Sequence, residues 1–578
     1  MAISQEPWWK GSVYQIYPAS FKDSNNDGIG DINGVIQSLD YIESLGVDIL
    51  WICPMYESPQ IDMGYDIADY KKVYGPYGTL EDMETLISEV HRRGMRIILD
   101  LVVNHTSDQH AWFKESRSSK CNPKRNWYIW KLAKYDSQGQ RRPPNNWRSN
   151  FGGSAWQWDE QTQEYYHHLF CPEQPDLNWD NEQTRKAIYA DAMIFWLQKG
   201  VNGFRIDTVN MYSKDPEFPD APITDAAAEW QEAGLTYCNG PRMNEYLSEM
   251  NDILAPYNAM SVGECPFTPD RDTVVGYVSS QKKRLNMVFQ FDAVDVGQGK
   301  VFKYQTEPFA YALRDLKDAV SRTQGLLCGT DGWTTTFIEN HDQARSISRF
   351  GDDSPRWRER SGKMLSLLFA ALSGTLFIYQ GQEIGMINMP SSWPIEEYKD
   401  VDSCNYYRMV AERSSNDPQQ LTQARASLQH LARDHARTPM QWGPSCNGGF
   451  TDDSVDPWMR VNPSTAEINV AQQTGSEDSV LAFWRQMLQV RKAHSDVLVH
   501  GIFEVVDAAN EKVFAFVKHG PRSKALIMCN FSPSYSEMPA YPSMGKKELV
   551  IGNVAELQDN GVARGILQPW EGRLYMLS

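Results

Sequence analysis

The sequence predicts an α/β protein: a (β/α)8 TIM barrel with an inserted subdomain after its third strand and a C-terminal antiparallel β domain. Eight short apolar runs alternate with amphipathic helical stretches along most of the 578 residues. Such repetition is typical of a closed parallel barrel. The alternation is interrupted after the third run, and beyond about residue 497 it gives way to short strands of alternating polarity.

The eight runs are rich in Val, Ile and aromatic residues and are mostly apolar throughout, which favours strands buried on both faces. They are Ser12–Pro18, Asp48–Tyr56, Arg96–His105, Val201–Asn210, Ala259–Phe267, Met287–Val296, Trp333–Asp342 and Thr375–Gly385. The helical stretches are Gly34–Leu45, Thr79–Arg93, Glu182–Lys199, Phe309–Leu326, Arg358–Leu372 and Asp478–Ala493. The second helix begins at Thr79, with Asp82 three residues later as in a capping box, and closes at Gly94.

Two segments interrupt the alternation. Thr106–Trp179 is rich in Trp, Asn, Pro and Gly and is too long for a plain loop, which indicates an inserted subdomain. Met386–Asn447, after the eighth strand, is polar and irregular with a helical patch. We therefore expect the barrel over residues 1–105 and 180–497, the inserted subdomain over 106–179, and a C-terminal β-sandwich over 498–578.

Composition and charge exclude several classes of partner. The 56 Lys and Arg residues against 74 Asp and Glu give a net charge of −18, and an acidic surface repels phosphate backbones, so we expect no nucleic-acid partner. No run approaches the ~18–20 apolar residues of a membrane span, and the N-terminal residues lack a signal-peptide pattern. The nine Cys are scattered and include no CxxC pair, which favours reduced thiols in a cytosolic protein. We expect a cytoplasmic protein, away from membranes, that is a monomer or a weak homo-oligomer.

Carboxylates lie where several predicted strands end. Asp207 follows the fourth strand, Glu264 ends the fifth and Asp342 follows the seventh. Since barrel enzymes place their catalytic residues at the carboxyl ends of the strands, we expect these three side chains to converge at one mouth. The same ends carry His105, Arg205 and His341.

Paired carboxylates suit glycoside hydrolysis, which needs one group to attack or to guide water and another to protonate the leaving oxygen. Metal-dependent hydrolysis is the alternative, but neither HExxH nor clustered Cys is present, so a catalytic zinc site is weakly supported.

Four motifs in order, DLVVNH, GFRIDTV, VGE and ENHD, resemble the signature regions of glycoside hydrolase family 13, the α-amylase family. The opening WWKGSVYQIYPASFKDSNNDGIGDINGV is similar to the oligo-1,6-glucosidase/α-glucosidase branch of that family, as are SPQIDMGYDIADY, QPDLNWDN and ARTPMQW. The resemblance covers nearly the whole chain and is strongest to fungal maltases and isomaltases.

The resemblance implies a role for each of the three carboxylates. Asp207 would be the nucleophile that forms a covalent glycosyl-enzyme, and Glu264 the acid and then the base. Asp342 would hold the sugar 2- and 3-hydroxyls. The residues agree with this assignment: Arg205, two residues before Asp207 on the same strand face, favours the ionised nucleophile, and burial favours a protonated Glu264. Retention predicts a separation of about 5–5.5 Å between the two carboxyl groups.

The resemblance also implies a substrate-binding set. It comprises Asp62, Tyr65, His105, Phe151, Phe170, Arg205, Thr208, His341 and Arg437. Within this set, Tyr65 would stack on the sugar, Phe151 and Phe170 would form the pocket wall, and Asp62 with Arg437 would close the pocket around a terminal glucose. The alternatives are core packing for the two Phe residues and a surface ion pair with Asp434 for Arg437.

Oxygen donors recur at alternate positions near the N-terminus. They are Asp23, Asn25, Asp27, the Ile29 carbonyl and Asp31, which resemble the start of an EF-hand loop, but the twelfth position is Gly34 rather than Glu. In the family branch this loop binds one structural Ca²⁺, and we expect no organic cofactor. Mg²⁺ and a metal-free Asp/Asn/Gly turn are the alternatives.

Thr208, directly after the proposed nucleophile, resembles maltases that prefer α-1,4 bonds, whereas enzymes that prefer α-1,6 bonds tend to carry Val at that position. Cys265, Pro266 and Phe267, which follow Glu264, match neither common yeast pattern. We therefore predict a retaining exo-acting α-glucosidase on maltose, maltotriose and short α-1,4 gluco-oligosaccharides, capable of transglucosylation, with isomaltose and sucrose as further candidate substrates. The alternatives are an oligo-1,6-glucosidase or isomaltase and, more remotely, a non-catalytic family 13-like scaffold protein.

Overall fold

The computed structural model describes residues 7–299, 303–304, 311–326, 328–541, 547–554 and 565–577. Its centre is a nearly closed barrel of eight parallel strands, as predicted. The strands are β1 (Ser12–Ile16), β2 (Ile49–Ile52), β5 (Arg96–Leu101), β11 (Gly203–Ile206), β12 (Met260–Glu264), β13 (Met287–Phe289), β14 (Thr335–Thr336) and β15 (Thr375–Tyr379).

The strands follow chain order around the barrel, and β15 pairs with β1, which brings the last strand back to the first. The gap between β13 and β14 is bridged by a side-chain hydrogen bond, in which Thr335 Oγ1 donates to the Val288 carbonyl at 3.1 Å. Strands β1, β2, β11, β12 and β15 are buried along their whole length, because side chains fill the barrel interior and helices cover its outside. The continuous apolar runs of the sequence reflect this double burial.

Helices cover the barrel, most of them where the apolar spacing predicts them and four of them (Met243–Leu254, Arg271–Val278, Ser346–Phe350 and Ser495–Leu498) where it does not. They are α1 (Ile32–Gln37), α2 (Leu39–Leu45), α3 (Leu80–Arg92), α5 (Glu182–Ile188), α6 (Phe195–Gln198), α8 (Met243–Leu254), α9 (Arg271–Val278), α10 (Leu313–Gly325), α11 (Ser346–Phe350), α12 (Arg358–Ala370), α17 (Val480–Ala493) and α18 (Ser495–Leu498). The predicted capping box of α3 is present, with Thr79 and Asp82 satisfying each other's backbone N–H. Residues 309 and 310 of the predicted helix before α10 lie outside the described residues.

Two of the helices predicted as continuous are interrupted. Ser38 separates α1 from α2, because its hydroxyl donates to the Gly34 carbonyl at 2.9 Å and its backbone leaves the helical region. A π-helical segment, Tyr189–Ile194, separates α5 from α6. Neither interruption moves the apolar face off the barrel, since Ile42, Ala192 and Trp196 are all buried.

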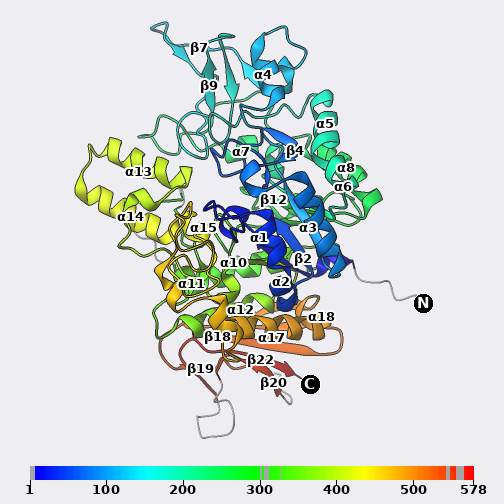
Figure 1. The fold of residues 1–578 in the computed structure, drawn as a ribbon, viewed down its shortest axis with the longest axis vertical. Coiled ribbons are helices and arrows are strands. Elements are labelled where there is room, and N and C mark those ends of the chain that lie inside the picture. The colour runs from blue at the N-terminus through cyan, green and yellow to red at the C-terminus, as the bar shows by residue number, and fades with distance from the viewer. Residues whose placement is uncertain are drawn as a thin grey trace.

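The segment after β5 folds mainly into α4 (Ala111–Ser118) and a three-stranded antiparallel sheet. The sheet consists of β6 (Trp130–Lys131), β10 (Glu164–His167) and β9 (Trp156–Asp159), and β7 (Lys134–Tyr135) pairs with β8 (Arg141–Arg142) beside it. This region forms one end of the long axis of the molecule in Figure 1. The loop after β11 packs against it, since Trp147 and Tyr237 share one apolar cluster.

After β15 the chain forms a helical hairpin at the side of the barrel, α13 (Val401–Arg413) and α14 (Pro418–Leu431), followed by α15 (Asp434–Arg437) (Figure 1). The hairpin has its own apolar cluster, which includes Tyr406, Val410 and Leu428. Asp402 on α13 and Arg433 before α15 line the cavity described below.

The C-terminal part is a five-stranded antiparallel sheet at the opposite end of the long axis from the β6–β10 region (Figure 1). Its order is β16 (Ile502–Val506), β17 (Val513–His519), β18 (Lys524–Asn530), β22 (Gly572–Leu577) and β20 (Lys547–Gly552), and β19 (Ser536–Glu537) pairs with β21 (Ile566–Leu567). Successive side chains of a strand point to opposite faces of the sheet. Phe514, Phe516 and Ile527 therefore lie in the barrel's core, and Ala515 and Met528 lie in a separate cluster on the other face. The sheet therefore joins the barrel through one apolar face.

Candidate active site

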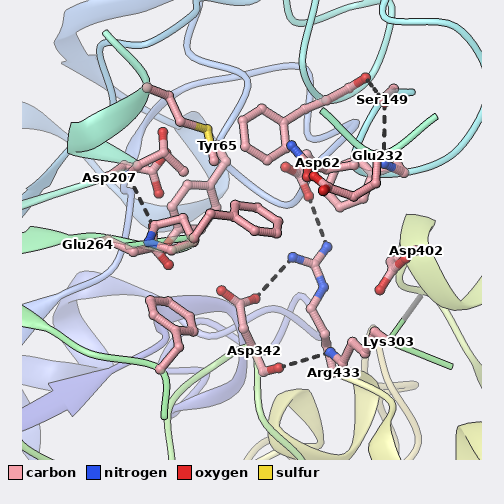
Figure 2. A pocket seen from close by; sticks show the side chains of 18 of the residues that line it. Asp62, Tyr65, Ser149, Asp207, Glu232, Glu264, Lys303, Asp342, Asp402 and Arg433 are labelled. Atoms are coloured by element: carbon pink, nitrogen blue, oxygen red, sulfur yellow. Dashed lines mark hydrogen bonds and ion pairs between the residues drawn. The ribbon is translucent and has the colours of Figure 1, made fainter. Parts of the chain in front are cut away.

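The three predicted catalytic carboxylates line one cavity of about 530 Å³ at the carboxyl ends of the barrel strands. Asp207 follows β11, Glu264 ends β12 and Asp342 lies in the loop after β14. Figure 2 shows Asp207 and Glu264 side by side, with Arg433 reaching between Asp62 and Asp342. A hollow of this size is typical of small-ligand sites.

Arg205, on β11, holds three carboxylates with one guanidinium. Its Nη1 donates to Asp207 Oδ1 at 2.6 Å and to Asp100 Oδ1 at 2.7 Å, and its Nη2 lies 2.9 Å from Glu264 Oε2. Arg205 is 1% exposed, and the carboxylates compensate the cost of burying its charge. The expected proximity of Asp207 and Glu264 therefore arises from a shared cation, which fixes both side chains.

Glu264 is suited to donate a proton near neutrality. Burial raises the pKa of its carboxyl to about 7, with Arg205 opposing and the charges of Asp207 and Asp342 adding to the rise. Burial also raises the pKa of Asp207 above its ordinary value, but Arg205 and the Thr208 hydroxyl oppose that rise. Arg205 therefore favours the ionised form of Asp207, as the sequence predicts, without fully cancelling the effect of burial.

Asp342 is the most strongly ionised of the three. Partial burial opposes its charge, but His341, Arg433 and Arg437 outweigh burial and hold the pKa of Asp342 well below its usual range. Arg437 Nη2 donates to Asp342 Oδ1 at 2.9 Å, and Arg433 Nη1 donates to the same oxygen at 3.1 Å. A fixed carboxylate of this kind can accept hydrogen bonds from sugar hydroxyls.

Thr208 joins Asp207 to Glu264. Its backbone N–H donates to Glu264 Oε2 at 3.0 Å, and its hydroxyl donates to Asp207 Oδ2 at 3.1 Å. To do this the residue takes a left-handed backbone conformation, φ 38°, which is rare for a β-branched side chain. Thr208 lines the cavity, so its side chain borders any sugar held between the two carboxylates.

The floor of the cavity contains Tyr65 and His341. Tyr65 Oη is hydrogen-bonded to His341 Nε2 at 2.6 Å, and the two rings stack with centroids 5.2 Å apart. Gln15 Nε2 contacts the other ring nitrogen, Nδ1, at 2.8 Å. Tyr65 lines the cavity, whereas His341, like Arg205, lies beneath the lining side chains.

The closed end of the cavity is built around Asp62. Gln174 Nε2 donates to Asp62 Oδ2 at 3.1 Å and contacts His105 Nε2 at 3.2 Å. The Phe170 ring lies 5.0 Å from the His105 ring and 5.6 Å from the Phe151 ring. The two predicted wall aromatics therefore line the cavity together, beside the predicted polar groups.

Arg433 takes the position expected of Arg437. Arg433 Nη2 donates to Asp62 Oδ1 at 3.3 Å and its guanidinium lies over the Phe151 ring at 5.0 Å, so Arg433, not Arg437, closes the cavity with Asp62. Arg437 is buried behind Asp342, and it pairs with Asp342 and Asp400 rather than with Asp434. Arg433 was not predicted, although it stands four residues before Arg437, the spacing that puts two side chains on one helix face.

Other lining residues follow no motif in the sequence. They are Arg148, Ser149, Asn150, Met211, Glu232, Tyr237, Pro266, Phe267, Phe291, Asp295, Gln298, Gly299, Lys303, Gln343 and Asp402. Figure 2 places Lys303 and Asp402 across Arg433 from Asp207. Most of these lining residues come from loops, and Asp402 comes from the start of α13. The course of these segments around the cavity depends on tertiary packing.

The predicted calcium loop, 23–31, is a series of turns closed by its own side chains. Asp23 accepts hydrogen bonds from the backbone N–H groups of Asn25, Asn26 and Gly28, and Asp31 caps α1. In the part of the chain that the structure describes, no three Asp, Glu, His or Cys side chains gather around a point that could hold a metal ion. The calcium prediction stays a prediction.

Comparison with known proteins shows the family to which the chain belongs. The model of the alpha amylase catalytic domain matches residues 15–501. The chain is 50% identical to an alpha-glucosidase of Candida albicans, covering all of both chains, and 46% identical to an oligo-1,6-glucosidase of Saccharomyces cerevisiae, covering 99% and 98%. The structure matches a Bacillus licheniformis trehalose-6-phosphate hydrolase with a TM-score of 0.90 at 37% identity, covering 99% of this chain and 100% of the other. This chain therefore belongs to the α-amylase family of glycoside hydrolases.

Proposed function

We propose that the protein is a retaining exo-acting α-glucosidase that releases α-glucose from the non-reducing ends of maltose, maltotriose and short α-1,4 gluco-oligosaccharides. The observation that carries the proposal is the sharing of Arg205 by Asp207 and Glu264, which keeps a nucleophile and a proton donor side by side in one cavity. Relatives named alpha-glucosidase and oligo-1,6-glucosidase support this chemistry.

In the first step, a carboxylate oxygen of Asp207 attacks the anomeric carbon while Glu264 gives its proton to the glycosidic oxygen, whose bond to that carbon breaks. In the second step, Glu264 takes a proton from water, which displaces Asp207 and restores the α configuration. A sugar hydroxyl in place of water gives transglucosylation. Asp342 would bind hydroxyls of the same glucose throughout.

Exo action follows from the closed end of the cavity. The Asp62–Arg433 ion pair, with Phe151 against the guanidinium, would stop a chain that continues past the terminal sugar. Asp62 and His105 would recognise the terminal hydroxyls, and Tyr65 would lie against the sugar face.

Replacing Asp207 with Ala tests the mechanism. We expect a folded protein whose maltose turnover falls by several orders of magnitude, because the covalent intermediate no longer forms. Sodium azide added to this variant should restore cleavage of an aryl α-glucoside and yield β-glucosyl azide, since azide attacks from the vacated side. Turnover of the variant close to that of wild type contradicts the mechanism. In wild-type enzyme, NMR should detect α-glucose before β-glucose.

The linkage preference rests on Thr208, which borders the neighbouring sugar. A single side chain there changes preference by ~1–3 kcal/mol, so isomaltose or sucrose turnover at a lower rate is compatible with a maltase. The test is kcat/KM on maltose against isomaltose with purified enzyme, with Thr208→Val as the partner variant. We expect wild type to favour maltose and T208V to shift toward isomaltose; a wild-type preference for isomaltose instead supports the oligo-1,6-glucosidase alternative.

We also propose that loop 23–31 binds one structural Ca²⁺, which would require Asp23, Asp27 and Asp31 to turn partly from loop amides toward the cation. The support is an oxygen-only donor set at alternate positions, the chemistry that Ca²⁺ prefers. EGTA should lower the Tm, calcium should restore it, and kcat/KM on maltose at low temperature should stay unchanged. A Tm that changes with neither EGTA nor calcium supports the metal-free turn.

For location, we propose the cytoplasm. All nine Cys are free, which fits a reducing compartment. No helix within the described residues is long and apolar enough to cross a membrane. The complete set of carboxylates in the cavity favours an enzyme over a scaffold protein.

A further inference from the structure

The loop over residues 58–66 carries Asp62 and Tyr65 into the catalytic cavity on a strained backbone. Gln60 and Met63 take left-handed conformations, φ 65° and φ 48°, which residues other than Gly seldom adopt. Such conformations persist only where the surrounding structure holds them. The position of the two cavity residues therefore depends on what fixes this loop.

Asp66 holds the loop from inside, and its side chain is 0% exposed. Its Oδ1 accepts hydrogen bonds from the Ser58 hydroxyl at 2.9 Å and from the Asp62 N–H at 3.1 Å. Its Oδ2 accepts the Ile61 N–H at 2.9 Å. The Ser58 hydroxyl in turn accepts the Gln60 N–H at 2.9 Å, so one of the left-handed residues is bound as well. A single carboxylate thus joins the start of the loop to its middle.

All three of these donors to Asp66 are uncharged, although burying a carboxylate is costly. Burial raises the pKa of Asp66 above its ordinary value, and the Ile61 and Asp62 N–H groups with the Ser58 hydroxyl oppose that rise. An Asn side chain would carry no charge, but its amide nitrogen is a donor and would face another donor. The loop therefore requires an acceptor oxygen at both positions of this side chain.

The Asp62 carboxylate has partners from distant parts of the chain. Its Oδ2 accepts from Gln174 Nε2 at 3.1 Å, and its Oδ1 accepts from Arg433 Nη2 at 3.3 Å, an interaction drawn in Figure 2. The Tyr65 N–H donates to the Asp62 carbonyl at 3.0 Å, so one turn carries both cavity residues. Asp62 reaches Gln174 and Arg433 together only while Asp66 keeps the backbone of the loop in place.

We infer that Asp66 is a positioning residue for recognition of the terminal glucose, because it holds the backbone that places Asp62 in the cavity. Asp66 does not line the cavity itself, so it acts through Asp62 rather than on the sugar. The inference rests on the proposed function and adds a residue on which the selection of a free non-reducing end depends.

A double-variant cycle tests the route through Asp62. Asp66→Asn keeps the size of the side chain but loses the bond to the Ile61 N–H. We expect D66N to lower kcat/KM on maltose about thirtyfold, since a small misplacement of a binding group is costly. Asp62→Asn should lower it further, and D62N/D66N should match D62N, because Asp66 then has no carboxylate left to place.

Deoxy substrates separate positioning from a general loss of structure. An aryl α-glucoside and its 4-deoxy and 6-deoxy analogues differ only in one terminal hydroxyl. Wild type should discriminate against at least one analogue by more than about tenfold, because buried polar groups are left unpaired. D66N and D62N should both reduce that ratio at least threefold. A structural defect alone would lower kcat/KM on all three substrates alike.

Asp159→Asn is the matched control. Asp159 is also 0% exposed and accepts a backbone N–H and a hydroxyl from Thr162, but it lies in the inserted region and does not line the cavity. D159N should lose Tm and keep the deoxy ratio of wild type.

Ser58→Ala removes one of the three bonds while Asp66 stays, and it serves if D66N does not fold. It should lower kcat/KM on maltose about threefold, with the same direction of change in the deoxy ratio. A wild-type ratio in whichever of D66N and S58A folds, or losses from D62N and D66N that multiply in the double variant, overturn the inference. Wild-type enzyme without α-glucosidase activity contradicts the proposed function instead, so the two failures are distinct.

Discussion

At the scale of single residues, the site depends on the sharing of one buried guanidinium by several carboxylates. Arg205 contacts Asp100, Asp207 and Glu264, so one positive charge faces three acidic groups. The three cannot all be ionised at low cost in a buried site, and the proton stays on the group that the guanidinium stabilises least. Burial raises the pKa of Asp100 to about 6 and that of Glu264 to about 7, which agrees with the proposed role of Glu264 as the proton donor.

The pH dependence of activity follows from Glu264. Since the acid must be protonated in the free enzyme, kcat/KM on maltose should fall as pH rises above about 7. Glu264→Gln should lower kcat/KM on maltose about a thousandfold and abolish this alkaline limb. A profile that stays flat from pH 6 to pH 9 in wild type contradicts the assignment.

Stability should respond to the same group with a defined sign. The folded Glu264 carboxyl holds its proton to about pH 7, whereas an unfolded Glu releases it near pH ~4.3, so stability falls as pH rises through this window. Glu264→Gln removes that dependence. Thermal unfolding should therefore show E264Q gaining Tm over wild type at pH 8 but not at pH 4; a gain that is equal at both values excludes this explanation.

At the scale of elements, α13 couples the helical hairpin to the catalytic cavity through its N-cap. Asp400 caps α13, and its carboxylate binds Arg433 at 2.8 Å and Arg437 at 2.6 Å. The same two arginines bind Asp342, so two carboxylates and two guanidiniums form a closed ring. Asp400 does not line the cavity and acts only by positioning the arginines.

Asp400→Asn should therefore lower kcat/KM on maltose about a hundredfold, because Arg433 and Arg437 lose their orientation toward Asp62 and Asp342. Asp159→Asn is the control, since Asp159 is equally buried and pairs with Arg117 at 2.6 Å in the inserted region, away from the cavity. Both variants should lose Tm, but only D400N should lose activity in the folded state. Equal activity losses contradict a positioning role.

The elements also show which features the sequence could predict. Each of the eight barrel strands lies inside a predicted apolar run, because burial on both faces leaves a continuous hydrophobic signal. The convergence of Asp207, Glu264 and Asp342 on one cavity was predictable from the rule that parallel strands end at one mouth. Arg433 was missed because a helix start places it, and its orientation depends on contacts that local sequence does not encode.

At the scale of the whole molecule, the C-terminal sheet is joined to the barrel by an interface that buries a lysine. Lys518 on β17 is 0% exposed and donates to the Ser373 hydroxyl beside the start of β15. Nearby Arg491 donates to the carbonyls of Ala370 and Leu372 at 2.6 Å. Burial, with the Arg491 charge adding to it, lowers the pKa of Lys518 well below its usual range.

Lys518→Met should accordingly stabilise the molecule, and most strongly at low pH. The pKa of the folded Lys518 lies well below that of an unfolded Lys, which keeps its proton up to about pH 10.4, so the folded residue releases its proton at lower pH and wild-type stability rises with pH until both states have released it. Differential scanning calorimetry should show K518M gaining more Tm at pH 6 than at pH 9. Lys512→Met, an exposed neighbour before β17, should gain none.

Because Asp207 and Glu264 share Arg205, a change in the charge of Asp207 during a catalytic cycle alters the pKa of Glu264. Under the proposed mechanism Asp207 becomes an ester that carries no charge, and the repulsion that helps to raise the pKa of Glu264 then disappears while the guanidinium remains. Glu264 then gives up its proton more readily, just when the second half-reaction needs a base. The same three side chains thus alternate between an acidic and a basic site, and the state of the nucleophile sets which one is present.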